Sequence, residues 1–290
     1  MATFDSVYKG TKGFFKKTFS YANKVEVKTS GDDGVAFTGC GGVKADKSGF
    51  ADLEGSYKSG PVRLDKLAFS SSGKFNADIS LPDVAADTKV TFKCEDGTRT
   101  SDASVSAKFG VVTTQDFGVA TGITVDVDAV KATVDASVLF NYDGVVFGAS
   151  GSLDTNLNAK DKKSPEVSKA DALIGYKTGD ATYGFQTSGK FTKGTAFVHS
   201  KMASGFTVTG DATFGLDGKA LKDVDVRLGG KYAWDSSTTL FGAVNKKAEV
   251  QFAYQQAISS STSLTVYSQV NALSLASDTH SFGTKLSLRA

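Results

Sequence analysis

The sequence has little proline, few cysteines and no long apolar segment. Among its 290 residues are 3 prolines and 2 cysteines, which excludes both a proline-rich disordered tract and a secreted scaffold held by disulfides. No stretch of 18 consecutive apolar residues occurs, so a transmembrane helix is excluded. The first residues also lack the continuous apolar run of a secretory signal peptide.

The chain also lacks an excess of charge of one sign. It carries 33 basic and 31 acidic residues, for a net charge of +2. Nucleic-acid binders present a strong positive field, so no nucleic-acid partner is expected. Any preference for charged partners must depend on where individual charges lie.

No set of residues suggests catalysis or metal binding. The only histidines, His199 and His280, lie far apart in strand-like sequence, where a lone histidine is usually a surface or lumen residue. Cys40 and Cys94 lack metal-ligand spacing and are expected to be free thiols. The run Gly39–Gly42 has no phosphate-loop continuation. We therefore expect neither an enzyme nor a cofactor.

What the chain does contain is period-two alternation. In Lys74–Leu81 the apolar residues Phe75, Ala77, Ile79 and Leu81 share one face, and polar residues share the other. Similar alternation occurs in residues 89–95, 102–109, 130–140, 249–255 and 281–289, with Leu139 as the one exception in its segment. These segments are predicted to be half-buried antiparallel strands.

Glycine-containing turns separate the strands at regular intervals. Hairpin signals occur at Gly31–Gly34, Glu95–Gly97, Tyr142–Gly144 and Leu216–Gly218, and Asn156–Lys169 is the longest candidate loop. Beyond residue 23, roughly 14 residues for each strand and turn give about 19 strands. A sheet of this size closes to remove its edges, and 16 or more strands leave an aqueous channel.

One segment, Phe4–Ser20, has helical periodicity instead. Its apolar or hydroxyl-bearing residues on one face are Phe4, Val7, Tyr8, Thr11, Phe14, Phe15, Thr18 and Phe19. Lysines fill the other face. A cleaved mitochondrial transit peptide and a helix lying flat on a membrane surface are alternatives, but we favour a helix inside the barrel lumen, where its lysines would bias the pore towards anions.

The fold class expected is therefore all-β: a single transmembrane β-barrel of about 19 strands, residues 24–290, with an N-terminal amphipathic helix and joint, residues 1–23, inside the lumen. A soluble β-rich lipid- or ligand-binding protein stays open, because alternation alone does not say which face is wet. Trp234 and Tyr232 are expected to be interfacial anchors. Basic residues of the helix and of the polar strand faces are the pore-lining candidates: Lys12, Lys16, Lys17, Lys74, Lys89, Lys93, Lys108, Lys231, Lys285 and Arg289.

The whole chain resembles the mitochondrial porins of eukaryotes, the voltage-dependent anion channel family. The likeness is carried by the basic N-terminal helix followed by KVEVKTS and GVAFTG, then TKVTFKCE, ALIGYKTGD, GGKYAW and the final HSFGTKLSLRA. The family's barrel has 19 strands. An odd number implies that the first strand, near Lys24–Ser30, pairs in parallel with the last, near Ser281–Arg289.

The resemblance implies a voltage-dependent, anion-selective channel of the mitochondrial outer membrane. Its partners would be membrane lipids and permeating anions and nucleotides (ATP, ADP, NAD and phosphate), with self-association or association with other mitochondrial membrane proteins left open. A protein-import pore of the same barrel superfamily is the alternative of similar fold.

The sequence departs from the family pattern at three places. The nucleotide-contacting Gly-Leu-Lys element corresponds to Asp87-Thr88-Lys89, which keeps only the lysine. The joint Ser20–Asn23 lacks the family's glycine hinge. The stretch Phe69–Gly73 lacks the membrane-facing glutamate that some members use for kinase docking.

Overall fold

The computed structural model shows 19 strands preceded by a short helical segment. It describes residues 4–19, 22–44, 46–58, 60–85, 87–97, 105–115, 119–128, 131–156, 165–202, 205–216, 224–275 and 280–289. The helices are α1 (Phe4–Val7) and α2 (Lys9–Lys17). The strands are β1 (Asn23–Ser30), β2 (Val35–Val43), β3 (Gly49–Tyr57), β4 (Arg63–Ser70), β5 (Phe75–Ala85), β6 (Thr88–Asp96), β7 (Val105–Gln115), β8 (Val119–Asp128), β9 (Lys131–Tyr142), β10 (Val145–Asn156), β11 (Glu166–Lys177), β12 (Ala181–Ser188), β13 (Lys193–Lys201), β14 (Phe206–Gly215), β15 (Asp225–Ala233), β16 (Thr238–Asn245), β17 (Glu249–Ala257), β18 (Thr262–Asn271) and β19 (Ser281–Arg289).

The strands form one hydrogen-bonded sheet that closes on itself. Each strand pairs with its neighbours in sequence, and β1 pairs with both β2 and β19. The expected 19-stranded β-barrel is thus confirmed. Because the strands are odd in number and sequential neighbours are antiparallel, β1 and β19 run in the same direction. At this seam the Asn23 Oδ1 accepts hydrogen bonds from the backbone N and the Oγ1 of Thr284, both at 3.0 Å.

Strands β3–β10 show the alternation that the sequence predicted. On β6, Phe92 is 44% exposed although it is apolar, while its neighbour Lys93 points to the opposite face and meets Asp78 of β5. The tight turn between β9 and β10 has positive φ at both Asp143 (46°) and Gly144 (81°), the backbone of a type I′ hairpin.

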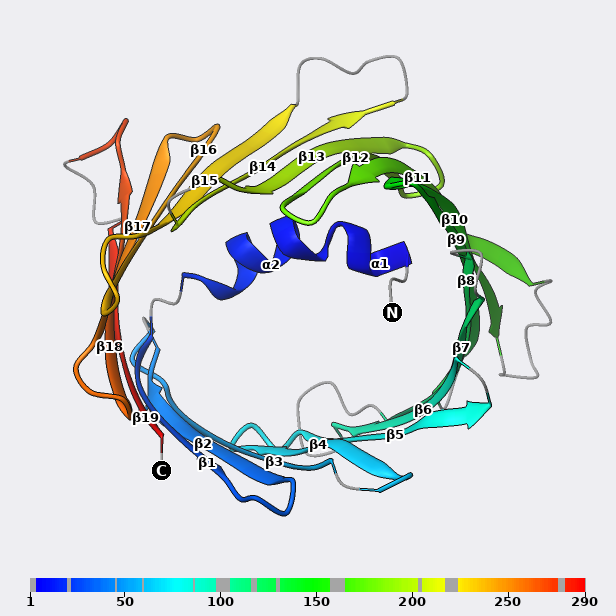
Figure 1. Ribbon diagram of the computed structural model, residues 1–290, viewed down its shortest axis with the longest axis horizontal. Coiled ribbons are helices and arrows are strands. Elements are labelled where there is room, and N and C mark those ends of the chain that lie inside the picture. The colour runs from blue at the N-terminus through cyan, green and yellow to red at the C-terminus, as the bar shows by residue number, and fades with distance from the viewer. Residues whose placement is uncertain are drawn as a thin grey trace. The chain divides into compact units, whose positions relative to one another are not determined.

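Strands β12–β19 repeat this arrangement and also carry the helix. Their uncovered apolar face includes Leu228, Val244, Phe252 and Val266, each at least 40% exposed. Helix α2 packs on the opposite, polar face, against β13 and β14 (Figure 1). If the bare apolar face meets lipid, the polar face that holds the helix is the lining of the barrel. No helix in the described part of the chain is both long and apolar enough to cross a membrane.

Two details correct the expectations. The N-terminal helix is not continuous, because it is interrupted at Tyr8, whose backbone (φ −85°, ψ −6°) precedes α2 without a side-chain cap. The candidate loop Asn156–Lys169 is too long, because β11 already begins at Glu166; residues 157–164 lie outside the described residues. Residues 98–104 after the Glu95–Gly97 turn signal, residues 217–218 of the Leu216–Gly218 signal and residues 20–21 of the Ser20–Asn23 joint also lie outside them.

Candidate functional site

Helix α2 is attached to the polar face by a charged network at its first turn. The Tyr8 hydroxyl donates a hydrogen bond to the Asp211 carboxylate on β14. Arg227, the directly opposite residue on β15, donates to both oxygens of Asp211, with Nε–Oδ1 at 2.9 Å and Nη2–Oδ2 at 2.6 Å. The Asp211 side chain is only 2% exposed. A bidentate pair of this kind is strong and directional, so it fixes where Tyr8 lies.

Burial and the hydrogen bond to Asp211 together raise the pKa of the Tyr8 phenol well above its usual value. The phenol therefore stays protonated and acts as a donor. Its ring also packs on Phe197 of β13, with centroids 4.8 Å apart. Tyr8 thus contributes both an apolar and a polar contact to the wall.

The next helical residues contact β13 directly. The Thr11 side chain, 1% exposed, donates to the backbone carbonyl of Val198 at 3.2 Å. Gly10 lies over His199: a Cβ built at Gly10 would be 3.1 Å from the imidazole Cδ2. This approach is tighter than ordinary contact, so the wall accepts the helix here because residue 10 has no side chain.

The C-terminal half of the helix docks through aromatic side chains. Phe14 and Phe19 form a buried cluster with Ala243, Ala253 and Tyr267 of β16–β18. Thus the expected apolar helix face does rest on an apolar part of the wall. Phe15, at the edge of this cluster, lies beneath the Arg227 guanidinium at 4.6 Å from ring centroid to Cζ, within the range of a cation–π interaction.

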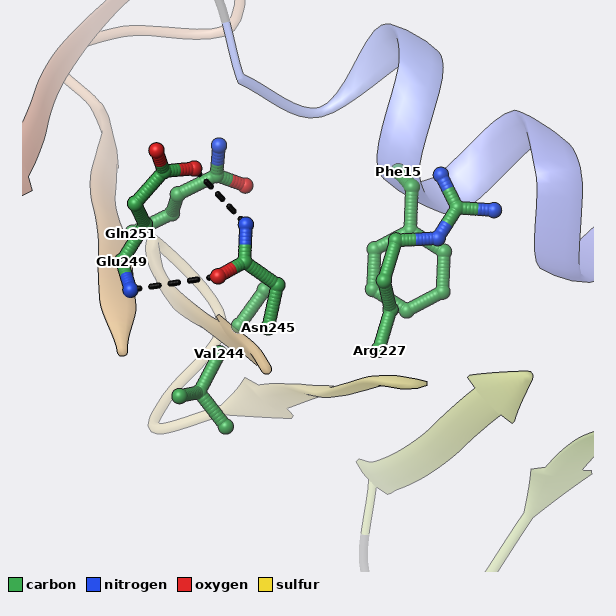
Figure 2. A pocket seen from close by; sticks show the side chains of 7 residues that line it. Phe15, Arg227, Val244, Asn245, Glu249 and Gln251 are labelled. Atoms are coloured by element: carbon green, nitrogen blue, oxygen red, sulfur yellow. Dashed lines mark hydrogen bonds between the residues drawn. The ribbon is translucent and has the colours of Figure 1, made fainter. Parts of the chain in front are cut away.

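A small pocket opens beside Phe15 and Arg227. Figure 2 shows these two side chains facing Asn245, Glu249 and Gln251 across it. The Asn245 Nδ2 donates to the Glu249 Oε2 at 2.7 Å. The volume of this pocket, about 190 Å³, is below the roughly 300–1,000 Å³ of ordinary ligand pockets. We regard it as a polar recess of the wall rather than a ligand site.

The predicted lysines of the helix lie on its exposed side. Lys12 and Lys16 are exposed, as is Lys9. None of these three has an ion-pair partner among the residues that the structure describes. The Lys17 side chain lies outside the described residues. The helix therefore presents exposed lysines on the side turned away from the wall.

Four of the predicted wall lysines lie on the polar face, but each is paired with an acid. The Nζ–carboxylate distances are 3.5 Å for Lys89 and Asp65, 3.4 Å for Lys93 and Asp78, and 2.8 Å for Lys285 and Glu26 of β1. Lys108 pairs with Asp126. Their charges are partly neutralised where they stand.

The three remaining basic candidates have other surroundings. The Lys231 ammonium lies 5.8 Å from the centroid of the Phe241 ring, on the face that holds α2. Lys74 is an exposed residue in the turn before β5, and Arg289 is exposed at the end of β19. These three residues therefore have different surroundings from one another.

Sequence reasoning missed the acidic partners and the Asp211–Arg227 pair. One signal was present for the acids: Asp78 and Asp126 share the polar face of their strands with the lysines. Leu139, the exception to alternation, signalled a different feature, a buried apolar spot on the polar face. It is 1% exposed on the polar face, and Val146 of the adjacent strand, also on that face, is 2% exposed.

The cysteines and histidines form no further site. Cys94 is a free thiol. No group of three or more His, Cys, Asp or Glu side chains is arranged for a metal ion in the described ranges. On the apolar face, Phe206, Tyr232 and Trp234 form a chain of edge contacts with centroids 6.3 and 6.1 Å apart. That Tyr232 and Trp234 lie at a membrane interface stays a prediction.

Comparisons with known proteins agree with this architecture. The family model described as eukaryotic porin matches residues 1–283. The non-selective voltage-gated ion channel VDAC2 of Xenopus laevis is 25% identical over 289 residues, which cover 97% of this chain and 96% of the relative. Its namesakes from Meleagris gallopavo and Rattus norvegicus are 24% and 23% identical, over 97% of this chain and 92% of each relative. The chain belongs to the eukaryotic porin family.

Proposed function

We propose that this protein is a voltage-gated channel of the mitochondrial outer membrane, through which ions and small metabolites diffuse. The observation that carries the proposal is a closed sheet of 19 strands with a bare apolar face and a charged face that holds a basic helix. A barrel of 16 or more strands encloses a water-filled channel. The relatives are named as channels, so neither an import pore nor a soluble binding protein is favoured, and the family indicates a channel rather than an enzyme.

Within this function we propose a preference for anions. The exposed Lys9, Lys12 and Lys16 would place positive charge beside the permeation path, and a charged lining raises the local concentration of counter-ions. The wall contributes less, because Lys89, Lys93, Lys108 and Lys285 are paired with acids. The permeants proposed are chloride, phosphate and nucleotides such as ATP, ADP and NAD. Self-association and association with other membrane proteins remain proposals of the same kind.

Planar-bilayer recording of the purified protein in a potassium chloride gradient tests the proposal. We expect discrete steps of conductance, and a conductance that decreases at high voltage of either sign. The reversal potential should lie nearer to the equilibrium potential of chloride than to that of potassium. A protein that dissolves without detergent and carries no current would contradict the channel. A reversal potential nearer to the equilibrium potential of potassium would contradict only the anion preference.

A further inference from the structure

Five charged residues form a continuous row across the polar face of β4–β8. Strand register places each one directly opposite the next, and we call them the charge row: Lys66, Asp78, Lys93, Lys108 and Asp126. The row runs perpendicular to the strands. On the channel function proposed above, it lines part of the permeation path.

At the centre of the row, two lysines face each other. Lys93 of β6 is the direct cross-strand partner of Lys108 of β7, and like charges in this position repel. Each lysine has a carboxylate on its other side. The Lys93 Nζ lies 3.4 Å from the Asp78 Oδ2, and Lys108 is bonded to the Oδ2 of Asp126.

The acids are more buried than the lysines. The side chains of Asp78 and Asp126 are each 24% exposed, whereas those of Lys93 and Lys108 are 48% and 40% exposed. The ammonium groups are thus the members that water and solutes reach. Without the flanking carboxylates, two adjacent ammonium groups would face the water, a suitable arrangement for an oxyanion with two negative charges.

We infer that Asp78 and Asp126 determine the ion specificity of this part of the wall. Each carboxylate forms an ion pair with a lysine that would otherwise bind a passing anion. The wall consequently favours anions only weakly and does not retain multivalent anions such as phosphate. This inference rests on the proposed channel function and adds to it the residues that limit its selectivity.

Stability does not account for the charge row. Ion pairs between partly exposed side chains contribute little to folding, because they are screened by water and salt and because ordering both side chains costs entropy. Neutralising Asp78 and Asp126 should therefore leave insertion intact. The effect should instead appear in permeation.

The test is bilayer recording of the double variant Asp78→Asn/Asp126→Asn beside the wild type. In a potassium chloride gradient, we expect the ratio of chloride to potassium permeability to rise about twofold or more. Addition of inorganic phosphate at constant ionic strength should lower the single-channel conductance of this variant and leave that of the wild type unchanged. A matched control, Asp32→Asn/Asp143→Asn, changes the net charge equally but acts at two exposed turn residues, so it should shift the ratio much less.

Adding Lys93→Gln and Lys108→Gln to the double variant should restore the wild-type ratio and remove the phosphate effect. The inference is overturned if the double variant has the wild-type reversal potential, if the control shifts it equally, or if phosphate still acts after both lysines are removed. Failure of the double variant to insert would also overturn it, because the row would then be structural. A wild type that carries no current would instead refute the proposed function.

Discussion

The hydroxyl of Tyr8 donates to the carboxylate of Asp211, a residue 203 positions later in the chain. Because Arg227 holds that carboxylate in a bidentate pair, the wall itself orients the acceptor. The contact joins the N-terminal helical segment to a wall strand. It therefore offers a direct way to weaken the docked helix.

Tyr8→Phe should loosen the helix without disturbing the sheet. The variant keeps the ring that packs on Phe197 but removes a hydrogen bond to a charged group, which contributes about 1.5–3 kcal/mol. Hydrogen exchange of the α2 amides should become faster, while exchange in β13 and β14 stays unchanged. Tyr142→Phe is the matched control, since Tyr142 is 80% exposed. Equal exchange in the two variants would show that the phenol does not hold the helix.

This network illustrates what the sequence could and could not predict. Alternation predicted that Phe92 and Lys93 lie on opposite faces, because a strand has a strict period of two. It could not predict that Asp211 meets Arg227. That pairing depends on register, and a slip of one residue would turn either side chain to the opposite face. The ends of β14 and β15 would have to be known to the residue.

The surroundings of the lysines on the polar face could not be predicted from the composition. Lys89, Lys93 and Lys108 were predicted to line the pore as positive charges, but their surroundings were not predictable from parity alone. Each proves to have a carboxylate within reach. Leu139, in contrast, is a visible exception to the alternation in the sequence. The structure shows that this apolar side chain is buried on the polar face.

The lysines of the helix should influence ion preference more than lysines elsewhere. Lys12→Gln/Lys16→Gln removes two exposed charges that have no ion-pair partner among the described residues. The reversal potential in a salt gradient should move towards the equilibrium potential of potassium, because the pore attracts fewer anions. Lys246→Gln/Lys247→Gln, in the exposed turn before β17, is the charge-matched control. If both pairs moved the potential equally, the helix would have no special part in selectivity.

A charge on the apolar face should impair folding, whereas loss of one from the polar face should not. Phe92 is 44% exposed on the apolar face, so Phe92→Arg should destabilise the barrel in a bilayer by about 2–4 kcal/mol if it lies near the midplane. Lys93→Ala, one residue along, is the control and should fold normally. Urea titration of the vesicle-inserted protein measures both. Equal tolerance of the two changes would contradict the assigned lipid-facing side.

The turn between β15 and β16 should be sensitive to acid. The Asp235 Oδ1 accepts hydrogen bonds from the Ser237 Oγ at 2.8 Å and from the Ser237 and Thr238 amides at 2.7 Å. The Ser237 hydroxyl, and then these amides, hold the pKa of Asp235 below its usual value.

A lowered pKa means that the folded turn prefers the carboxylate. Its contribution is therefore complete above the usual aspartate value of about 3.9 and is lost as the pH falls through the lowered value. NMR titration of the Ser237 and Thr238 amide shifts should give a midpoint below about 3.9, and Asp235→Asn should abolish the transition. A midpoint at or above the usual value would show that these hydrogen bonds do not favour the carboxylate.

Two helical glycines should respond differently to the same substitution. Alanine is a better helix former than glycine by about 1 kcal/mol. At Gly13 a new Cβ would have nothing within 4 Å, so Gly13→Ala should stabilise α2 by about that amount. At Gly10 the Cβ would press on His199 at 3.1 Å, so Gly10→Ala should gain less or lose stability. Hydrogen exchange of the α2 amides measures both variants. In a His199→Ala background the difference between them should disappear, because the ring that opposes the Gly10 methyl is gone; a persistent difference would mean that α2 does not dock on β13 through Gly10.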